Sequence, residues 1–253
     1  MRLSYSKLST FLDCGLRYRL KYVEKVPSRP KPYLRFGKIL HSVLKEFYSY
    51  PGPGKPELEH LLSYYRAFWP RENEGYRRYF KQGVEILERY YQANIQTYAR
   101  PYWIEEPFKV PVGQHTLIGR FDRVDHLGDD RYEIVDYKTE KAIPTQEKVD
   151  GDLQLSIYAL AFRKIMGILP EVLSVYHLRS NQKLGTVRTE EGLRQLEEKA
   201  TATISEILGG ASFKPRENRE CRFCDYRKYC PLKSDHPEPI PSKTSPQMEL
   251  VFA

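Results

Sequence analysis

The stretch Gly119–Thr139, GRFDRVDHLGDDRYEIVDYKT, constrains the fold of this chain more than any other. Apolar and polar residues alternate in its first half, Leu127–Asp130 is a cluster of turn-forming residues, and Tyr132–Tyr137 favours a β-strand. The pattern predicts a β-hairpin. A protein built around it must place both strands in a sheet and cover that sheet with the helices that the rest of the sequence indicates.

Charged residues of this hairpin point to a metal site. Asp122 is on the first strand, while Asp136 and Lys138 are two apart on the second and so face the same side. Two carboxylates and a lysine beside apolar strands are costly to bury unless they share a cation. Metal-assisted phosphodiester cleavage uses such a set. An edge hairpin with a surface Asp–Lys pair is the alternative.

The pattern G-x-x-D-R-x-D followed by I-V-D-Y-K-T resembles the core of the PD-(D/E)XK nucleases, specifically the RecB-family nuclease domain. The resemblance implies that Asp122 and Asp136 bind Mg²⁺ or Mn²⁺, with the backbone carbonyl of Tyr137 as a further ligand. It implies that Lys138 orients the nucleophilic water or stabilises the transition state.

His41 lies in Arg35–Tyr50, whose apolar residues have helical spacing. A lone histidine on such a helix usually serves packing. The run Gly37–Phe47, G-x-x-x-H-x-x-L-x-x-F in outline, is however similar to the motif before the RecB-type core, where the histidine is a metal ligand. Imidazole suits Mn²⁺ better than Mg²⁺, so His41 would bias the metal preference.

Gln154 and Tyr158 stand four residues apart on a predicted helix, Asp152–Gly167, and therefore share a face. The resemblance places such a Q-x-x-x-Y pair near the active site, in contact with DNA or with the metal-bound water. A surface glutamine and a half-buried tyrosine are the alternative.

Three cysteines are clustered near the C-terminus: Cys221, Cys224 and Cys230, separated by two and then five residues. Such soft ligands need a fourth, and Cys14 is the other cysteine in the chain. The arrangement resembles the 4Fe–4S staple of AddB-type nucleases, which would close a loop of about two hundred residues. Structural zinc is the competing interpretation, because four thiolates also suit Zn²⁺.

The net charge of +8, from 41 basic and 33 acidic residues, favours a polyanionic partner. We expect the arginines and lysine beside the cysteines to contact nucleic acid or to remain a solvated surface: Arg219, Arg222, Arg227 and Lys228. No apolar run is long enough to span a membrane and no secretory signal is visible, which predicts a cytoplasmic protein.

The remaining pattern predicts mostly helices around the sheet. Ser4–Tyr22 reads as a helix broken near Gly15, and Glu140–Asp150 reads as a polar loop. Other expected elements are helices at Glu57–Phe68, Tyr76–Tyr98 and Glu190–Leu208, and strands at Pro101–Val112, Glu171–His177 and Lys183–Arg188. The segment of about 51–100 is either an insertion that shapes a DNA channel or plain scaffold.

The tail 235–253 is polar and proline-rich, and we expect it to be flexible. It ends in SPQMELVFA, where Gln247, Leu250 and Phe252 resemble the peptide with which bacterial DNA-processing proteins dock on the sliding clamp. A tail that folds back over the domain is the alternative.

We therefore predict an α/β fold: a PD-(D/E)XK restriction-endonuclease-like core with a central mixed sheet, flanking helices and a terminal Fe–S staple, over residues 1–234. The predicted activity is that of a Mg²⁺- or Mn²⁺-dependent deoxyribonuclease acting on single-stranded ends or flaps in DNA repair, recombination or replication. No nucleotide-binding G-x-x-x-x-G-K-[ST] motif is present, so a motor would be a separate protein. The alternative is a non-catalytic Fe–S DNA-binding subunit beside a helicase or CRISPR protein.

Overall fold

The computed structural model describes residues 1–70, 77–209 and 213–241. The chain forms two compact units: a cysteine unit, Met1–Pro30 with Lys199–Ala253, and a sheet unit, Lys31–Glu198. The predicted division into a nuclease domain at 1–234, with a helical insertion, and a tail at 235–253 stays a prediction.

A mixed β-sheet forms the centre of the sheet unit. Its strands are β2 (Trp103–Val112), β3 (His115–Gly128), β4 (Arg131–Lys138), β5 (Val172–His177) and β6 (Gln182–Thr186). They pair in the order of their numbers, and each pair is antiparallel except β4 with β5. The predicted α/β fold with a mixed sheet and flanking helices is confirmed.

The predicted hairpin is β3–β4. Its strands pair from Arg123 opposite Val135 to the turn, where Gly128 and Asp129 have left-handed backbone angles (φ 102° and 49°). Glycine and aspartate tolerate these angles, which explains why this cluster turns the chain. The pair farthest from the turn is Arg123 with Val135. Asp122 and Asp136 are the next residues beyond this pair, one on each strand, where the strand pairing has ended.

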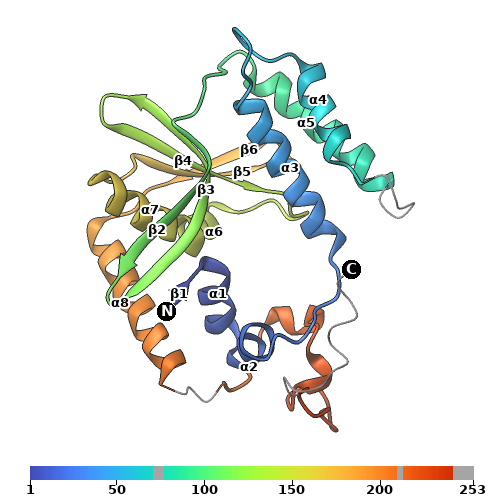
Figure 1. Ribbon diagram of the computed structural model, residues 1–253, viewed down its shortest axis with the longest axis vertical. Helices are drawn as coiled ribbons and strands as arrows, with labels where there is room; N and C mark the ends of the chain where they lie inside the picture. The colour runs from blue at the N-terminus through green and yellow to red at the C-terminus, as the bar shows by residue number, and fades with distance from the viewer. Residues whose placement is uncertain (71–76, 210–212, 242–253) are drawn as a thin grey trace. The chain divides into compact units, whose positions relative to one another are not determined.

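A layer of three helices lies on one side of this sheet: α3 (Pro32–Tyr48) and α5 (Arg77–Asn94) pack on the strands, and α4 (Leu58–Phe68) packs against these two helices (Figure 1). The apolar stripe of α3 includes Leu40, Leu44 and Phe47, which are fully buried. These side chains pack in one core with Val135 and Tyr137 of β4. The helix that carries His41 is thereby held against the strand that carries Lys138.

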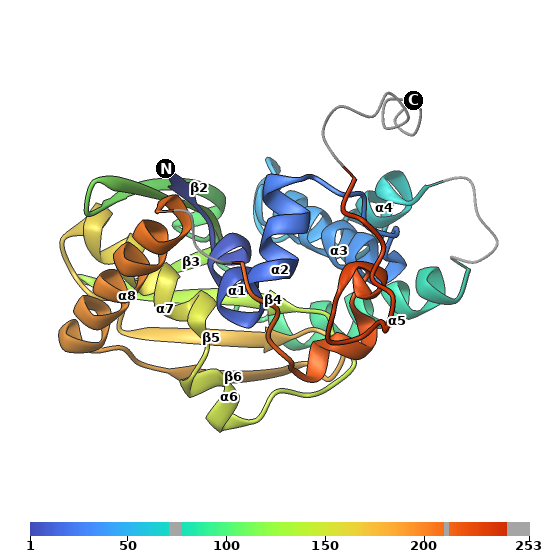
Figure 2. The same ribbon diagram turned by 90° about the horizontal axis from the view of Figure 1, so that it is seen from below.

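Helix α7 (Leu153–Met166) packs against the other face, where Phe162 contacts Phe121 of β3. Its first turn is capped by Asp152, whose side chain accepts the N–H of Leu155 at 2.8 Å. The expectation of a loop over Glu140–Asp150 is wrong in its second half, because Thr145 caps a short helix, α6 (Gln146–Asp150), beside β6 (Figure 2).

The cysteine unit is built from the two ends of the chain. Its elements are β1 (Arg2–Leu3), α1 (Tyr5–Asp13), α2 (Gly15–Tyr18), a π-helical turn (Arg19–Val23), two 3₁₀ turns (Arg219–Phe223 and Arg227–Tyr229) and the end of α8 (Glu190–Leu208). The predicted break near Gly15 is confirmed, because extended Cys14 separates α1 from α2. In the described ranges, no helix has the length and apolar character needed to cross a membrane.

Candidate active site

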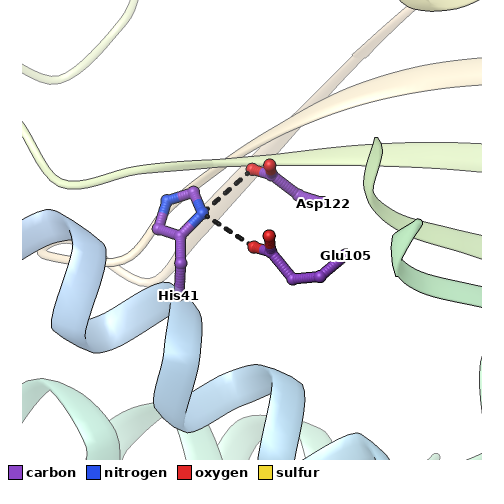
Figure 3. A group of neighbouring side chains, drawn as sticks. All are labelled: His41, Glu105 and Asp122. Atoms are coloured by element: carbon purple, nitrogen blue, oxygen red, sulfur yellow. Dashed lines mark ion pairs between the residues drawn. The ribbon is translucent and has the colours of Figure 1, made fainter. Parts of the chain in front are cut away.

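Three possible metal ligands converge in the sheet unit: His41 of α3, Glu105 of β2 and Asp122 of β3 (Figure 3). His41 Nδ1 lies 3.4 Å from Glu105 Oε1 and 3.4 Å from Asp122 Oδ2. The three ligand atoms all lie within 4.8 Å of one another, and the side chains are largely buried. One nitrogen and carboxylate oxygens at this spacing suit a hard divalent cation.

Glu105 was missed by sequence reasoning, and strand register explains its position. Ile104 pairs with Arg123 and Glu106 pairs with Phe121, so Glu105 stands across from Asp122. Its φ of 50° is left-handed, which a non-glycine residue adopts at a cost on the order of 1–3 kcal/mol. The available signal was the spacing from the turn Gly113–Gln114, because Glu105 lies eight residues before Gly113 and Asp122 lies eight residues after Gln114.

The main chain of Tyr137 holds two of these ligands in place. Its N–H donates to Asp122 Oδ2 at 2.9 Å, and its carbonyl accepts the N–H of His41 Nε2 at 3.0 Å. That second hydrogen bond turns Nδ1 towards the carboxylates, in the way that ligating histidines are commonly oriented. The predicted role of the Tyr137 carbonyl as a metal ligand itself stays a prediction.

Charge repulsion between the two acids is relieved here by the imidazole. Burial lowers the pKa of His41, but Asp122 and Glu105 outweigh burial and raise that pKa well above its usual range. Two carboxylates across from each other on neighbouring strands destabilise a sheet unless positive charge lies between them. A divalent cation would supply that charge in place of the proton.

Asp136 and Lys138 form a second row of polar groups next to these ligands. Lys138 Nζ lies 2.5 Å from Asp136 Oδ2 and donates to Gln154 Oε1 at 2.8 Å. Gln154 Nε2 in turn donates to the hydroxyl of Tyr158 at 2.9 Å. This chain of contacts agrees with the expectation that Asp136 and Lys138 face the same side of β4. It also agrees with the expectation that Gln154 and Tyr158 lie near these two residues.

Asp136 is almost completely inaccessible, with 1% of its surface exposed. Burial raises its pKa to about 7, Lys138 opposes that shift, and Asp122 adds to it. The negative charge of Asp122 is therefore felt at Asp136. Among the described residues, however, the group of three possible metal ligands does not include Asp136. Its role as a metal ligand stays a prediction.

All four cysteines line one pocket within the cysteine unit, and all four thiols are free. Cys14, Cys224 and Cys230 pack against a small apolar core that includes Leu20 and Tyr226. Hydrogen bonds join the two chain ends there, from Tyr226 to the carbonyl of Val26 at 3.1 Å and from Asn218 to that of Asp13 at 3.0 Å. The structure thus places Cys14 in the same pocket as the three C-terminal cysteines, while their role as ligands of one cofactor stays a prediction.

Comparison with known proteins decides the family. The model of the PD-(D/E)XK nuclease superfamily matches residues 2–231. The chain belongs to this superfamily. The gene 69 protein of Mycobacterium phage D29 is 22% identical to this nuclease over 266 residues, which cover 90% of this chain and 96% of the phage protein.

A crystal structure of a candidate exonuclease from Eubacterium rectale resembles this nuclease with a TM-score of 0.55. The match covers 88% of this chain and 86% of the other, at 12% sequence identity, so the likeness concerns the fold. Nucleases of this superfamily use divalent metals, and the group of His41, Glu105 and Asp122 could bind one. The predicted superfamily is confirmed, while the RecB-family assignment stays a prediction.

Proposed function

We propose that this nuclease hydrolyses DNA phosphodiester bonds with a Mg²⁺ or Mn²⁺ ion held by His41, Glu105 and Asp122, with Asp136 as a further ligand. The observation that carries the proposal is the approach of His41 Nδ1 to within 3.4 Å of both Glu105 and Asp122. When bound, the ion would supply Lewis-acid chemistry, polarising the scissile phosphate and easing deprotonation of the attacking water.

The residues fit such an ion. The left-handed backbone at Glu105 brings a second carboxylate to Asp122, although like charges repel at that distance. Among the described residues, Asp136 Oδ2 is buried without a hydrogen bond of normal geometry and keeps an ion pair with Lys138. An imidazole with several carboxylates favours Mn²⁺ and accepts Mg²⁺.

The residues that would act on the DNA and on the attacking water are Lys138, Gln154 and Tyr158. The side chain of Lys138 is 20% exposed, and its ammonium group is fixed by Asp136 and Gln154, so it can orient a water and offset charge that develops on the phosphate. Gln154 and Tyr158 extend this row and would orient the DNA strand. By analogy with the family we propose exonuclease or flap cleavage at single-stranded ends, in DNA repair, recombination or replication.

Cleavage assays with end-labelled single-stranded, duplex and flap DNA test this proposal. We expect products with Mn²⁺ and Mg²⁺, none with EDTA, and the fastest cleavage on free single-stranded ends. If wild-type protein binds DNA but cuts no substrate with any divalent metal, the alternative of a non-catalytic DNA-binding subunit replaces it.

We further propose that the four cysteines hold a 4Fe–4S cluster, as the resemblance to AddB-type nucleases implies. All four cysteines line one pocket and all four thiols are free, which supports their joint use as ligands of one cofactor. Four thiolates would also suit one zinc ion. Arg17, Arg227 and Lys233 also line the pocket and would offset the thiolate charge.

Metal analysis of anaerobically purified protein separates the two cofactors. We expect iron, inorganic sulfide and broad visible absorption, all lost in Cys221→Ser. Colourless protein with stoichiometric zinc would refute the cluster.

A sliding clamp is the partner that we propose for the C-terminal peptide, whose residues Gln247, Leu250 and Phe252 lie outside the described ranges. Titration of a Gln247–Ala253 peptide against clamp should show saturable binding that Phe252→Ala abolishes. Absence of binding by the wild-type peptide would end this part of the proposal and leave a helicase or CRISPR protein as the partner to test.

A further inference from the structure

The position of one residue, Tyr137, controls most of the site. Its main-chain N–H and carbonyl bind Asp122 and His41, as described above, and its neighbours in sequence are Asp136 and Lys138. A shift of Tyr137 along or across β4 would therefore displace all four side chains together. Whatever fixes Tyr137 therefore fixes these four side chains.

The side chain of Tyr137 is fixed by a buried polar cluster on the face of the sheet that packs against α3 and α5. Arg123 Nη1 donates to the hydroxyl oxygens of Tyr48 at 2.6 Å, Tyr137 at 2.8 Å and Tyr90 at 3.0 Å. The Tyr90 hydroxyl also lies 2.7 Å from that of Tyr48 and 2.9 Å from that of Tyr137. We name these four residues the arginine–tyrosine cluster.

Stability alone is a weak reason for such a cluster. Arg123 is 6% exposed, and an ion taken out of water costs several kcal/mol that its partners only partly return. Asp125 balances its charge at 2.9 Å, but Arg123 Nε is buried without a hydrogen-bond partner among the described residues. A set of apolar side chains would pack at this place with less cost.

The cluster instead joins three of the elements that carry the site: β3, β4 and α3. Arg123 is next to Asp122 on β3, Tyr137 lies between Asp136 and Lys138 on β4, and Tyr48 is on α3, two helical turns after His41. Tyr90 comes from α5 and closes the group. Burial raises the pKa of Tyr90 and of Tyr137 well above the usual range, so these hydroxyls stay neutral donors.

We propose that the arginine–tyrosine cluster is a positioning device that sets the geometry of the metal ligands through Tyr137, and that Tyr90 belongs to it although it touches none of them. This inference rests on the proposed function of the site. The cluster acts by holding β3, β4 and α3 at one mutual distance, which a divalent ion with fixed coordination requires.

The test compares two tyrosine-to-phenylalanine variants by Mn²⁺ titration calorimetry without DNA. Tyr90→Phe keeps the ring and removes three contacts of the cluster. Tyr65→Phe is the matched control, because Tyr65 is also fully buried in the same helical layer while its hydroxyl donates to the carbonyl oxygens of Tyr79 and Phe80. Both variants lose one buried hydroxyl and should lose similar stability.

We expect the Mn²⁺ dissociation constant to rise about 10-fold in Tyr90→Phe, the lower end for residues that orient ligands, and to stay at the wild-type value in Tyr65→Phe. With DNA, kcat should fall in Tyr90→Phe at unchanged KM. Tyr48→Phe carries the same expectation if Tyr90→Phe does not fold.

Equal Mn²⁺ affinity in Tyr90→Phe and wild type would overturn the inference while leaving the proposed function intact. An equal loss of affinity in Tyr65→Phe would also overturn it, because the effect would then be one of general stability. Wild-type protein that binds no Mn²⁺ would refute the proposed function itself.

Discussion

The cysteine unit and the sheet unit differ sharply in charge. Met1–Pro30 and Lys199–Ala253 together hold 16 Lys and Arg against 9 Asp and Glu, a balance of +7. Lys31–Glu198, about twice as long, holds 25 against 24, a balance of +1. Nearly all of the net charge of +8 therefore lies outside the unit that holds the proposed metal site.

This difference in charge suggests that one unit attracts DNA and the other holds the groups for hydrolysis. A hydrolytic site must gather carboxylates, which repel DNA, and the sheet unit balances them with cations in specific pairs such as Asp136 with Lys138. Excess positive charge attracts a polyanion without regard to sequence. We therefore expect the cysteine unit to contribute most of the binding strength and the sheet unit to set the reaction rate. Each variant below changes one of the two.

The largest effect is expected from Cys221→Ser in the cysteine unit. That unit has a small apolar core, and a link between Cys14 and Cys221 closes a loop of about 200 residues, for which the loop-closure model gives about 5 kcal/mol. We expect loss of iron and of roughly that unfolding free energy in denaturant titrations of the cysteine unit. Mn²⁺ affinity should not change. Wild-type stability in the iron-free variant would contradict the proposed cross-link.

Lys138→Ala is expected to lower the rate of cleavage about 1,000-fold, the scale for removal of a group that stabilises transition-state charge. DNA affinity should remain within a few-fold of wild type, which single-turnover cleavage and equilibrium binding would show. Lys164→Ala is the matched control, because Lys164 is similarly exposed (24% against 20%) and pairs with Glu197 at 2.8 Å. Equal losses in both variants would mean that Lys138 has no special role.

Glu105→Gln should raise the Mn²⁺ dissociation constant by about 10- to 100-fold, because it removes one of the two carboxylates beside His41. Its neighbour Glu106 is exposed and pairs with Phe121, so Glu106→Gln should bind Mn²⁺ as wild type does. Calorimetry of both variants measures the difference. Unchanged affinity in Glu105→Gln would remove Glu105 from the site.

The smallest expected effect is on the salt dependence of DNA affinity. Arg219→Ala with Arg222→Ala removes two exposed charges of the cysteine unit and should reduce the slope of log affinity for DNA against log salt concentration by about two. Arg131→Ala with Arg194→Ala removes two exposed charges of the sheet unit, each paired with a glutamate, and should leave the slope unchanged. A larger change of the slope in the Arg131→Ala, Arg194→Ala variant would mean that the sheet unit, and not the cysteine unit, binds the DNA backbone.

Local patterns of the sequence predicted the elements and part of the site. The two-residue spacing of Asp136 and Lys138 and the four-residue spacing of Gln154 and Tyr158 are properties of one strand and one helix, so they could be recognised without the fold. The family motif added His41. Each of these residues lies where the corresponding element was expected.

Contacts between distant segments were not predictable in this way. Glu105 depends on the register between β2 and β3 and on an unusual backbone angle, and neither leaves a composition pattern. The arginine–tyrosine cluster joins residues from four elements, and its tyrosines look in sequence like packing residues. The sequence does not predict helix α6, because its single turn is too short to show helical periodicity.

Anomalous diffraction from crystals soaked in Mn²⁺ tests the central claim most directly. We predict one strong manganese peak in contact with His41 Nδ1 and with carboxylate oxygens of Glu105 and Asp122. Manganese bound elsewhere, with His41 left in its ion pairs with Glu105 and Asp122, would contradict the account of how this nuclease works.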